Sequence, residues 1–357
     1  MIRILNAAGQ ITPLAALLNL LACLSRSLPL FSSTLLGQIE EESGHSEIIV
    51  ILCAIIRNHL EPTKQIPHAP VLGNETVGLV EGLCWVSKDE LVPRLATFCN
   101  SIDVWMILLD ASQPSCLLDR STRLLVFLAT HSKLSRDLLS GSELSPSLPE
   151  AKAKELPRLP HIERLCSYLI DTSRKDPEFV NMKTNILTFF GILSVAHADV
   201  HTMLVGAPTL IPSLVALSTQ VTTLLWEGDE FFMTPHEKIA SSIRTLNQTL
   251  FLLHHLVFGL EPNFNLRHKL HYAPHRTFTG IAHMFIVTFG RLSCADPPEW
   301  IDLTHKQELE GMSEMAQDLL ELVVDGPEGD SIWAAYQADH GNDSDTDEED
   351  METKLLG

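Results

Sequence analysis

The chain has 357 residues, of which 45% are hydrophobic and 20% are charged. This is enough apolar material for a large core, which excludes a chain that is disordered throughout. Acidic residues outnumber basic residues 45 to 25, and the formal net charge is −20. Such a charge disfavours a domain that grips a nucleic-acid backbone over a broad surface. The seven cysteines lack the spacing of a secreted disulfide framework, so reduced thiols are expected.

Membrane association is not expected from the sequence. The longest uninterrupted apolar run, from Ile48 to Ile56, is far shorter than the about 20 residues of a spanning helix. The N-terminal segment resembles a secretory signal in composition, but Asn6, Gln10 and Pro13 interrupt its apolar stretch. The segment is better explained as a helix with Thr12 as its N-cap. We therefore expect an intracellular protein.

Apolar residues recur at helical spacing along nearly the whole chain, and the alternation typical of strands is rare. The pattern predicts an all-α fold. The predicted helices lie near residues 12–24, 30–42, 46–60, 75–87, 89–110, 114–131, 133–140, 161–173, 177–205, 209–226, 235–259, 276–293, 304–325 and 328–338.

Several helix ends are predicted from capping chemistry. Two segments carry a Thr followed three residues later by Glu or Gln, which is the capping-box pattern, and a third begins with Asp-Pro. Two helices are expected to end at a left-handed glycine. These positions are Thr234 to Glu237, Thr304 to Gln307, Asp176-Pro177, Gly206 and Gly326.

The short helices and their turns predict stacked helical hairpins, that is, an α-solenoid of the HEAT or armadillo type. Residues 141–160 contain four prolines among Ser, Lys and Glu, which predicts an exposed linker. It separates an N-terminal helical block, 1–140, from a C-terminal helical block, 161–338. Residues 339–357 hold eight carboxylates and one lysine, and this composition predicts a disordered acidic tail.

A histidine cluster is the most suggestive candidate for a metal site. The six residues are His254, His255, His268, His271, His275 and His283. Zinc needs three or four convergent ligands, whereas adjacent histidines on a helix point about 100° apart. No cysteine lies between Cys166 and Cys294 to complete a mixed site. We therefore predict no metal, and instead a mildly basic, aromatic segment that docks an acidic partner or is simply solvated.

No catalytic centre or cofactor site is predicted. The sequence lacks the glycine-rich phosphate loops, the GxSxG elbow and the kinase signatures. Cys294 lies near a loop, but no local signature marks it as a nucleophile. The chain is therefore expected not to be an enzyme and to need no cofactor.

Candidate partner-binding residues lie around the predicted helix 304–325. Aromatic residues flank it and apolar residues form a stripe along it, and aromatic anchors often dominate interfaces. The candidates are Trp300, Met312, Met315, Leu319, Trp333 and Tyr336. The same pattern also fits a stripe that completes the core of the helical array. In the tail, Ser344 and Thr346 each have an acidic residue three positions on, so they are candidate phosphorylation sites.

Long segments resemble a known family. They are LIPSLVALSTQVTTLLWEGDEFF, SSIRTLNQTLFLLHHLVFG, APHRTFTGIAHMFIVTFGRLSCADPPEWID and DLLELVVDGPEGDSIWAAYQ, within residues 204–337, together with LLNLLACLSRSLPLFSSTLL near the N-terminus. These resemble the C-terminal helical-repeat region of the fungal ATR-interacting protein (ATRIP) family. The match lies in long segments and not in a compact catalytic motif.

The resemblance implies a non-catalytic adaptor that binds an ATR-type checkpoint kinase in the nucleus, in the response to DNA damage and replication stress. Family members also carry an N-terminal coiled coil and an acidic motif that contacts the single-strand-binding protein RPA. This sequence has no sustained heptads and no acidic motif before its helices, so we expect an indirect association with RPA-coated single-stranded DNA. A homodimer within the kinase complex stays open. The alternative function is a helical-repeat scaffold of another multiprotein complex.

Overall fold

The regular structure of the protein is helical. A computed structural model describes residues 1–37, 46–62, 68–86, 91–139, 160–227, 236–259, 264–274 and 276–324. These ranges contain α-helices and one short 3-10 helix, and no β-strand occurs within them. The all-α prediction is therefore confirmed. The predicted helix 328–338 and the acidic tail lie outside the described residues.

The chain divides into two compact units, residues 1–210 and 211–357. The helices of the first unit are α1 (Ile2–Ala7), α2 (Ile11–Ser27), α3 (Pro29–Gly37), α4 (Glu47–His59), α5 (Ala69–Val86), η1 (Val92–Leu95), α6 (Ala96–Cys99), α7 (Ile102–Leu108), α8 (Ser115–Ala129), α9 (Ser132–Leu139), α10 (Pro160–Ile170), α11 (Pro177–Ala196) and α12 (Ala198–Gly206). The helices assigned to the second unit are α13 (Leu210–Glu227), α14 (His236–Phe258), α15 (Leu266–His271), α16 (Ile281–Cys294), α17 (Leu303–Glu310) and α18 (Ser313–Glu321).

The division of the chain differs from the one expected at residues 141–160. Helices α8 and α11, which lie before and after that segment, pack against each other within the first unit. Residues 141–159, where the exposed linker is predicted, lie outside the described residues. The proline-rich composition of such a segment carries no information on which helices share a core, because that depends on the apolar surfaces of helices before and after it.

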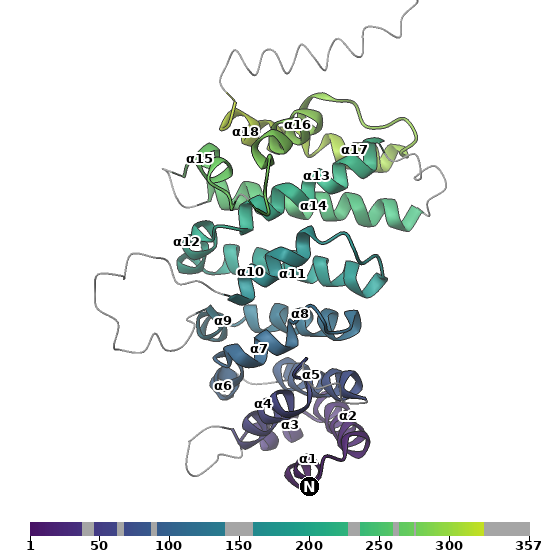
Figure 1. Ribbon diagram of the computed structural model, residues 1–357, viewed down its shortest axis with the longest axis vertical. Coiled ribbons are helices and arrows are strands. Elements are labelled where there is room, and N and C mark those ends of the chain that lie inside the picture. Colours follow the sequence, from purple (N-terminus) through teal and green to yellow (C-terminus); the bar gives the residue numbers. More distant parts are fainter. Residues whose placement is uncertain are drawn as a thin grey trace, which may run out of the picture. The chain divides into compact units, whose positions relative to one another are not determined.

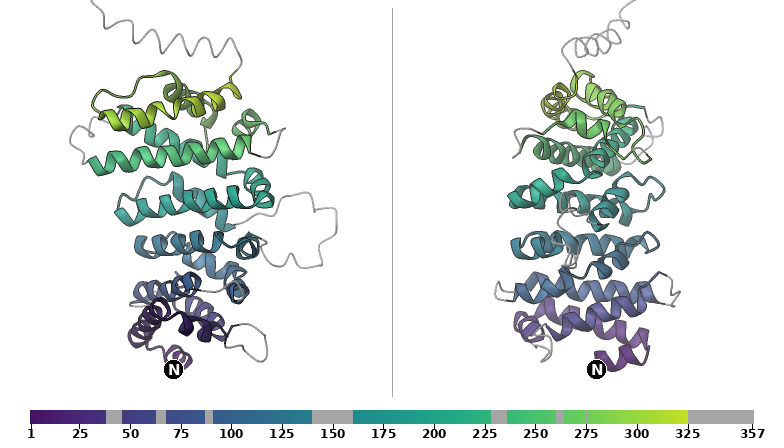
Figure 2. Two further views of the ribbon diagram at one scale, coloured as in Figure 1. Left: turned by 180° about the vertical axis from the view of Figure 1, so that it is seen from behind. Right: turned by 60° about the vertical axis from the view of Figure 1, so that its left-hand side comes forward.

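Four helices of the first unit pack one against the next in chain order: α2 on α5, α5 on α8 and α8 on α11 (Figures 1 and 2). Leu18 of α2, Leu83 of α5 and Leu124 of α8 are fully buried. Complete burial of one such side chain contributes about 1.5–3 kcal/mol. The middle of α5 is buried almost all round, because it has neighbours in this series on two sides.

Helix α11 is long and apolar enough to cross a membrane by length and composition alone. In the structure it packs against α8, and its Phe179, Phe189 and Phe190 are fully buried. The side of α11 that packs on its neighbours thus belongs to the core of the first unit, while Val180 and Val195 on other sides are exposed.

The contact between α2 and α5 depends on a glycine. A Cβ atom at Gly82 would lie 2.4 Å from the hydroxyl oxygen of Ser25. Ser25 is buried, and its hydroxyl donates a hydrogen bond of 2.8 Å to the carbonyl of Ala22. The absence of a side chain at position 82 therefore sets how closely the two helices approach.

Capping geometry confirms one predicted helix start and corrects others. Asp176 precedes α11, and its Oδ1 accepts a hydrogen bond of 3.0 Å from the backbone N–H of Phe179, as predicted. The cap of α17 is Asp302, which accepts from the N–H of His305 at 3.0 Å, so Thr304 is not the N-cap. Helix α2 begins at Ile11, which places Thr12 inside the helix.

The prediction of a left-handed glycine at the end of α12 is corrected in part. Gly206 ends α12 as predicted, but it is not left-handed, since Gly9 and Gly280 are the glycines with positive φ in the described part of the chain. The predicted capping box at Thr234 and the predicted stop at Gly326 lie outside the described residues.

Three long predicted helices are broken in the structure. The range 89–110 holds η1, α6 and α7, the range 177–205 holds α11 and α12, and the range 304–325 holds α17 and α18. At His197, between α11 and α12, the backbone is extended, and its Nε2 lies 3.2 Å from the carbonyl oxygen of Ala129 in α8. Periodicity persists through such breaks because the apolar residues on both sides still face the same core. The short helices α1 and α15 were not predicted.

The second unit is held by apolar and polar contacts around α16. Helix α16 packs on α15 and α18, and α14 packs on α17 and α18. The stacked rings of Phe285 and Phe289, 4.2 Å apart, are fully buried. The hydroxyls of Thr219 and Thr288 lie 2.8 Å apart and join α13 to α16.

We predict that Gly82→Ala destabilises the protein by about 1–3 kcal/mol, because the new methyl group must displace the buried Ser25. Alanine is otherwise favoured over glycine within a helix by about 1 kcal/mol. The free energy of unfolding, measured by urea denaturation, checks this. The double variant Ser25→Ala/Gly82→Ala should recover most of the loss, since the clashing oxygen is gone.

The matched control is Gly191→Ala in α11, where an added Cβ meets nothing within 4 Å. It should stabilise the protein by about 0.5–1 kcal/mol. Equal stabilities of Gly82→Ala and Gly191→Ala would contradict the close approach of α2 and α5.

Candidate functional site

The candidate partner-binding residues fall into three groups. Met312 and Leu319 are buried, with 1% and 0% of their surface exposed, so they belong to the core of the second unit. Met315 and Trp300 are half-exposed. Trp333 and Tyr336, like Ser344 and Thr346, lie outside the described residues. Two of the candidate residues, Met312 and Leu319, thus belong to the core. Contact of the candidate residues with a partner stays a prediction.

One face of α14 is an exposed aromatic surface of the second unit. Phe251 and Phe258 are 56% and 47% exposed, and they lie two turns apart with His254 and His255 between them. The ring of Phe251 stacks on His255 at 6.3 Å, and the ring of His254 lies 4.5 Å from Phe258. The sequence alone did not single out this face.

Helix α18 contributes to the same surface. Asp318 Oδ2 lies 3.1 Å from His254 Nε2, and Leu322, one turn further along, is 42% exposed. Exposed aromatic rings beside apolar and titratable groups are typical of protein interfaces, because such rings bury a large area at little entropic cost. We call this surface, formed by Phe251, His254, His255 and Phe258 with Asp318 of α18, the α14 face.

The histidine cluster of the sequence is spread over several contacts. His254 pairs with Asp318, while His268 and His271 lie against the ring of Tyr272 at 4.3 Å and 5.2 Å. His275 lies outside the described residues. Among the residues that the structure describes, no group of three His, Cys, Asp or Glu side chains could hold a metal ion.

The cysteines are mostly buried in apolar surroundings. Burial raises the pKa of the Cys84 thiol to about 12 and that of Cys53 to about 11. A thiol with a raised pKa is a poor nucleophile, because the thiolate is the reactive form. Cys294 is half-exposed, and its Sγ lies 3.4 Å from the hydroxyl of Ser293. No general base accompanies it in these contacts.

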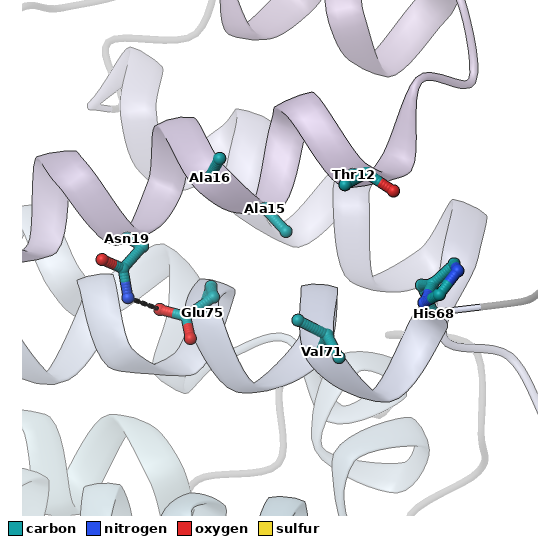
Figure 3. A pocket seen from close by; sticks show the side chains of 7 residues that line it. All are labelled: Thr12, Ala15, Ala16, Asn19, His68, Val71 and Glu75. Carbon is teal, nitrogen blue, oxygen red and sulfur yellow. Dashed lines mark hydrogen bonds between the residues drawn. The ribbon is translucent and has the colours of Figure 1, made fainter.

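A shallow pocket of about 260 Å³ lies between α2 and α5 (Figure 3). Thr12, Ala15 and Ala16 line one wall, and His68, Val71 and Glu75 line the other. Asn19 donates a hydrogen bond of 2.7 Å from its Nδ2 to Glu75. The lining of the pocket is mostly apolar, and its one carboxylate is hydrogen-bonded to an amide.

Comparison with known proteins gives no further guide to the family: the sequence matches no family model, no curated protein and no solved structure.

His161 is a buried titratable group without a partner. It lies in α10, is 1% exposed, and neither of its ring nitrogens has a hydrogen-bond partner in the described structure. Burial lowers the pKa of His161 to about 4, because the charged form loses its hydration. The unfolded chain therefore binds a proton between pH 6.5 and about 4, where the folded chain does not.

We predict that this histidine lowers the stability of the protein as the pH falls through that window, by up to about 3 kcal/mol. The measurement is the thermal midpoint against pH, followed by circular dichroism. His161→Leu should flatten the curve between pH 6.5 and 4 relative to the parent protein. His283→Leu, at an exposed position of α16, is the control and should leave the curve unchanged. Parallel curves for the parent protein and His161→Leu would contradict the prediction.

Proposed function

We propose that the protein is a non-catalytic adaptor subunit that binds an ATR-type checkpoint kinase in the response to DNA damage and replication stress. Two lines of support carry the proposal. The first is the resemblance of residues 17–36 and of segments within 204–337 to the fungal ATR-interacting protein family. The second is an all-helical chain in which α2, α5, α8 and α11 of the first unit pack one on the next.

The architecture that fits this role is an α-solenoid of HEAT or armadillo type. In such proteins each helical hairpin contacts its neighbours in the chain, and the stack presents a long surface to partners. The succession of α2, α5, α8 and α11 in the first unit supports this class, since each helix of the series packs on the next. The task of such an adaptor is to present helix faces to the larger solenoid of the kinase.

The α14 face is the surface that we assign to the kinase contact. Phe251 and Phe258 leave about half of their area exposed in the isolated chain, and a partner helix would cover both. Burying large aromatic side chains at the centre of an interface supplies much of the binding free energy. Met315 and Trp300, in the same unit, stay candidates for the edge of this contact.

Other parts of the proposal follow from the same role. The protein is expected in the nucleus, associated with RPA-coated single-stranded DNA through its partners and not by direct contact with duplex DNA. The net charge of −20 supports that expectation, because it repels a phosphate backbone. No membrane association, cofactor or enzymatic activity is proposed. Homodimerisation within the complex and phosphorylation of Ser344 and Thr346 stay predictions.

The alternative is a scaffold in another multiprotein complex. The helical architecture fits both functions equally well, because helical repeats serve many partners. The resemblance of the sequence segments favours the kinase adaptor.

The test is a pull-down of the tagged full-length chain from nuclear extract, read by quantitative mass spectrometry. The parent protein should retain an ATR-type kinase. The variant Phe251→Asp/Phe258→Asp should retain about tenfold less, because two buried carboxylates without partners oppose the contact.

Leu30→Asp is the control, since it makes the same kind of apolar-to-Asp change, with one added charge, at a residue of the first unit that is 78% exposed. It should leave kinase recovery unchanged. If all three proteins recover the kinase equally, the assignment of the α14 face is wrong while the adaptor function holds. Recovery of a different complex, without such a kinase, would favour the scaffold.

A further inference from the structure

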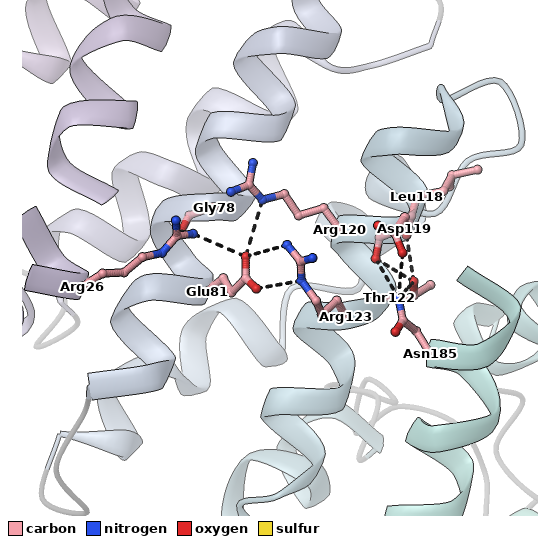
Figure 4. Close-up of polar contacts among 9 residues, drawn as sticks. All are labelled: Arg26, Gly78, Glu81, Leu118, Asp119, Arg120, Thr122, Arg123 and Asn185. Atoms are coloured by element: carbon pink, nitrogen blue, oxygen red, sulfur yellow. Dashed lines mark hydrogen bonds and ion pairs between the residues drawn. The ribbon is translucent and has the colours of Figure 1, made fainter. Parts of the chain in front are cut away.

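In the first unit, three arginines surround one buried carboxylate, which is more positive charge than a single carboxylate neutralises. The carboxylate belongs to Glu81 of α5, which is 8% exposed. Among the Asp and Glu residues that the structure describes, only Glu81 is buried. Arg26 of α2 and Arg120 and Arg123 of α8 converge on it from two sides (Figure 4). We call these four residues the arginine cluster.

The three arginines contribute unequally. Arg123 binds Glu81 with two nitrogens, at 2.7 Å and 3.2 Å. Arg120 reaches it at 3.4 Å and Arg26 at 3.5 Å. Arg26 also donates to the carbonyl of Gly78 at 3.3 Å. A Cβ atom at Gly78 would lie 2.5 Å from Arg120, so the missing side chain makes room for that guanidinium.

One guanidinium neutralises one carboxylate, so three leave a surplus of two positive charges within the cluster. Asp119 is a further carboxylate near Arg123, and it accepts a hydrogen bond of 2.9 Å from Asn185. Counting Asp119 still leaves one surplus positive charge. Like charges held together destabilise a fold, and proteins tolerate such arrangements where an anionic partner compensates them.

The surplus charge is accessible. The side chains of Arg26 and Arg123 are 45% and 44% exposed, and that of Arg120 is 16% exposed. Both terminal nitrogens of Arg120, Nη1 of Arg123, and Nε and Nη1 of Arg26 have no hydrogen-bond partner among the described residues. Guanidinium groups with free N–H groups are suited to carboxylates and phosphates, which they bind through two parallel hydrogen bonds.

An exposed tryptophan lies one helical turn away. Trp85 follows Glu81 by four residues on α5, and Phe127 follows Arg123 by four residues on α8. Their rings meet edge to face, with centroids 5.3 Å apart. Helices α5 and α8 therefore contact each other through the Glu81–Arg123 ion pair and, one turn further along, through this aromatic pair. Trp85 is 70% exposed, which is far more than its packing on Phe127 requires. A large exposed aromatic ring beside arginines is typical of a binding hot spot.

We propose that the arginine cluster and Trp85 form a docking site for an acidic segment of a partner protein, one that carries an apolar side chain next to its carboxylates. The carboxylates would bind the free N–H groups of the arginines, and the apolar side chain would cover the exposed ring of Trp85. The site lies in the first unit, whereas the proposed kinase contact lies on the α14 face. The inference therefore does not rest on the proposed function, and its test contains no kinase.

A peptide is favoured over a nucleic acid by the charge around the site. The surplus at the cluster is one or two charges in a chain of net charge −20, which is too few to hold a long phosphate backbone. A short acidic segment with a single apolar anchor matches both the small number of free donors and the single exposed ring.

The test uses the full-length protein and fluorescence anisotropy of a short, fluorescein-labelled peptide of Asp and Glu around one central Phe. The peptide should bind more weakly as ionic strength rises. A peptide with Asn and Gln in place of the acids, and one with Ala in place of Phe, should each bind at least about tenfold more weakly.

Three variants probe the protein side. Arg26→Glu, at the most weakly paired arginine, should weaken binding about tenfold, and Trp85→Ala should do the same. Glu81→Gln removes the competing negative charge and keeps a hydrogen-bond acceptor, so it should strengthen binding severalfold. A purely structural role of the cluster would give no gain in Glu81→Gln.

Arg136→Glu is the matched control, since Arg136 is 63% exposed and pairs with one carboxylate, that of Asp199. It should leave peptide affinity unchanged. Unchanged circular-dichroism spectra verify that the variants are folded.

The proposal is overturned if the parent protein does not bind the acidic peptide, or if Arg136→Glu weakens binding as much as Arg26→Glu. It is also overturned if a single-stranded oligonucleotide binds with the same dependence on Arg26 and Trp85 while the peptide does not. Binding of the peptide only after deletion of residues 339–357 would assign the site to the chain's own acidic segment instead of a partner.

Discussion

The carboxylate of Glu81 lies buried in α5, the helix that packs on α2 and on α8, and burial of an ion is tolerated only when its charge is compensated by close partners. Compensation comes from arginines on α2 and α8, the two helices that flank α5. The arginines of α2 and α8 thus meet at one carboxylate of α5, which adds a specific polar contact to the apolar packing of these helices.

Packing and charge act together at this point. Gly82 lets α2 approach α5 closely enough for Arg26 to reach Glu81, and Gly78 leaves room for Arg120. Further along the series, Asn185 of α11 donates to both the backbone carbonyl and the carboxylate of Asp119 in α8. Polar contacts thus follow the apolar contacts from α2 to α11, and they make one face of the first unit specific in shape and in charge.

The sequence predicted the fold class and most helices, because helical periodicity and proline or Asp-Pro starts are local signals. It did not predict the break at His197, which depends on a contact with α8. It left open whether the stripe with Met312 and Leu319 serves the core or a partner, and both residues are buried. Nor did it reveal the arginine cluster, since Arg26, Glu81 and Arg123 are far apart in the chain and meet only after folding. The exposed state of Phe251 was hidden for a related reason: an aromatic residue in an apolar helix looks like a core residue until its neighbours are known.

A double-mutant cycle between Glu81 and each arginine tests the central claim, that this carboxylate ties α2, α5 and α8 together. The free energies of unfolding of the Glu81→Ala, Arg→Ala and double variants give the coupling energy of each pair. The account predicts a coupling of about 1–3 kcal/mol with Arg123, a smaller one with Arg120 and the smallest with Arg26. A coupling near zero with all three arginines, or a larger one with Arg26 than with Arg123, would contradict it.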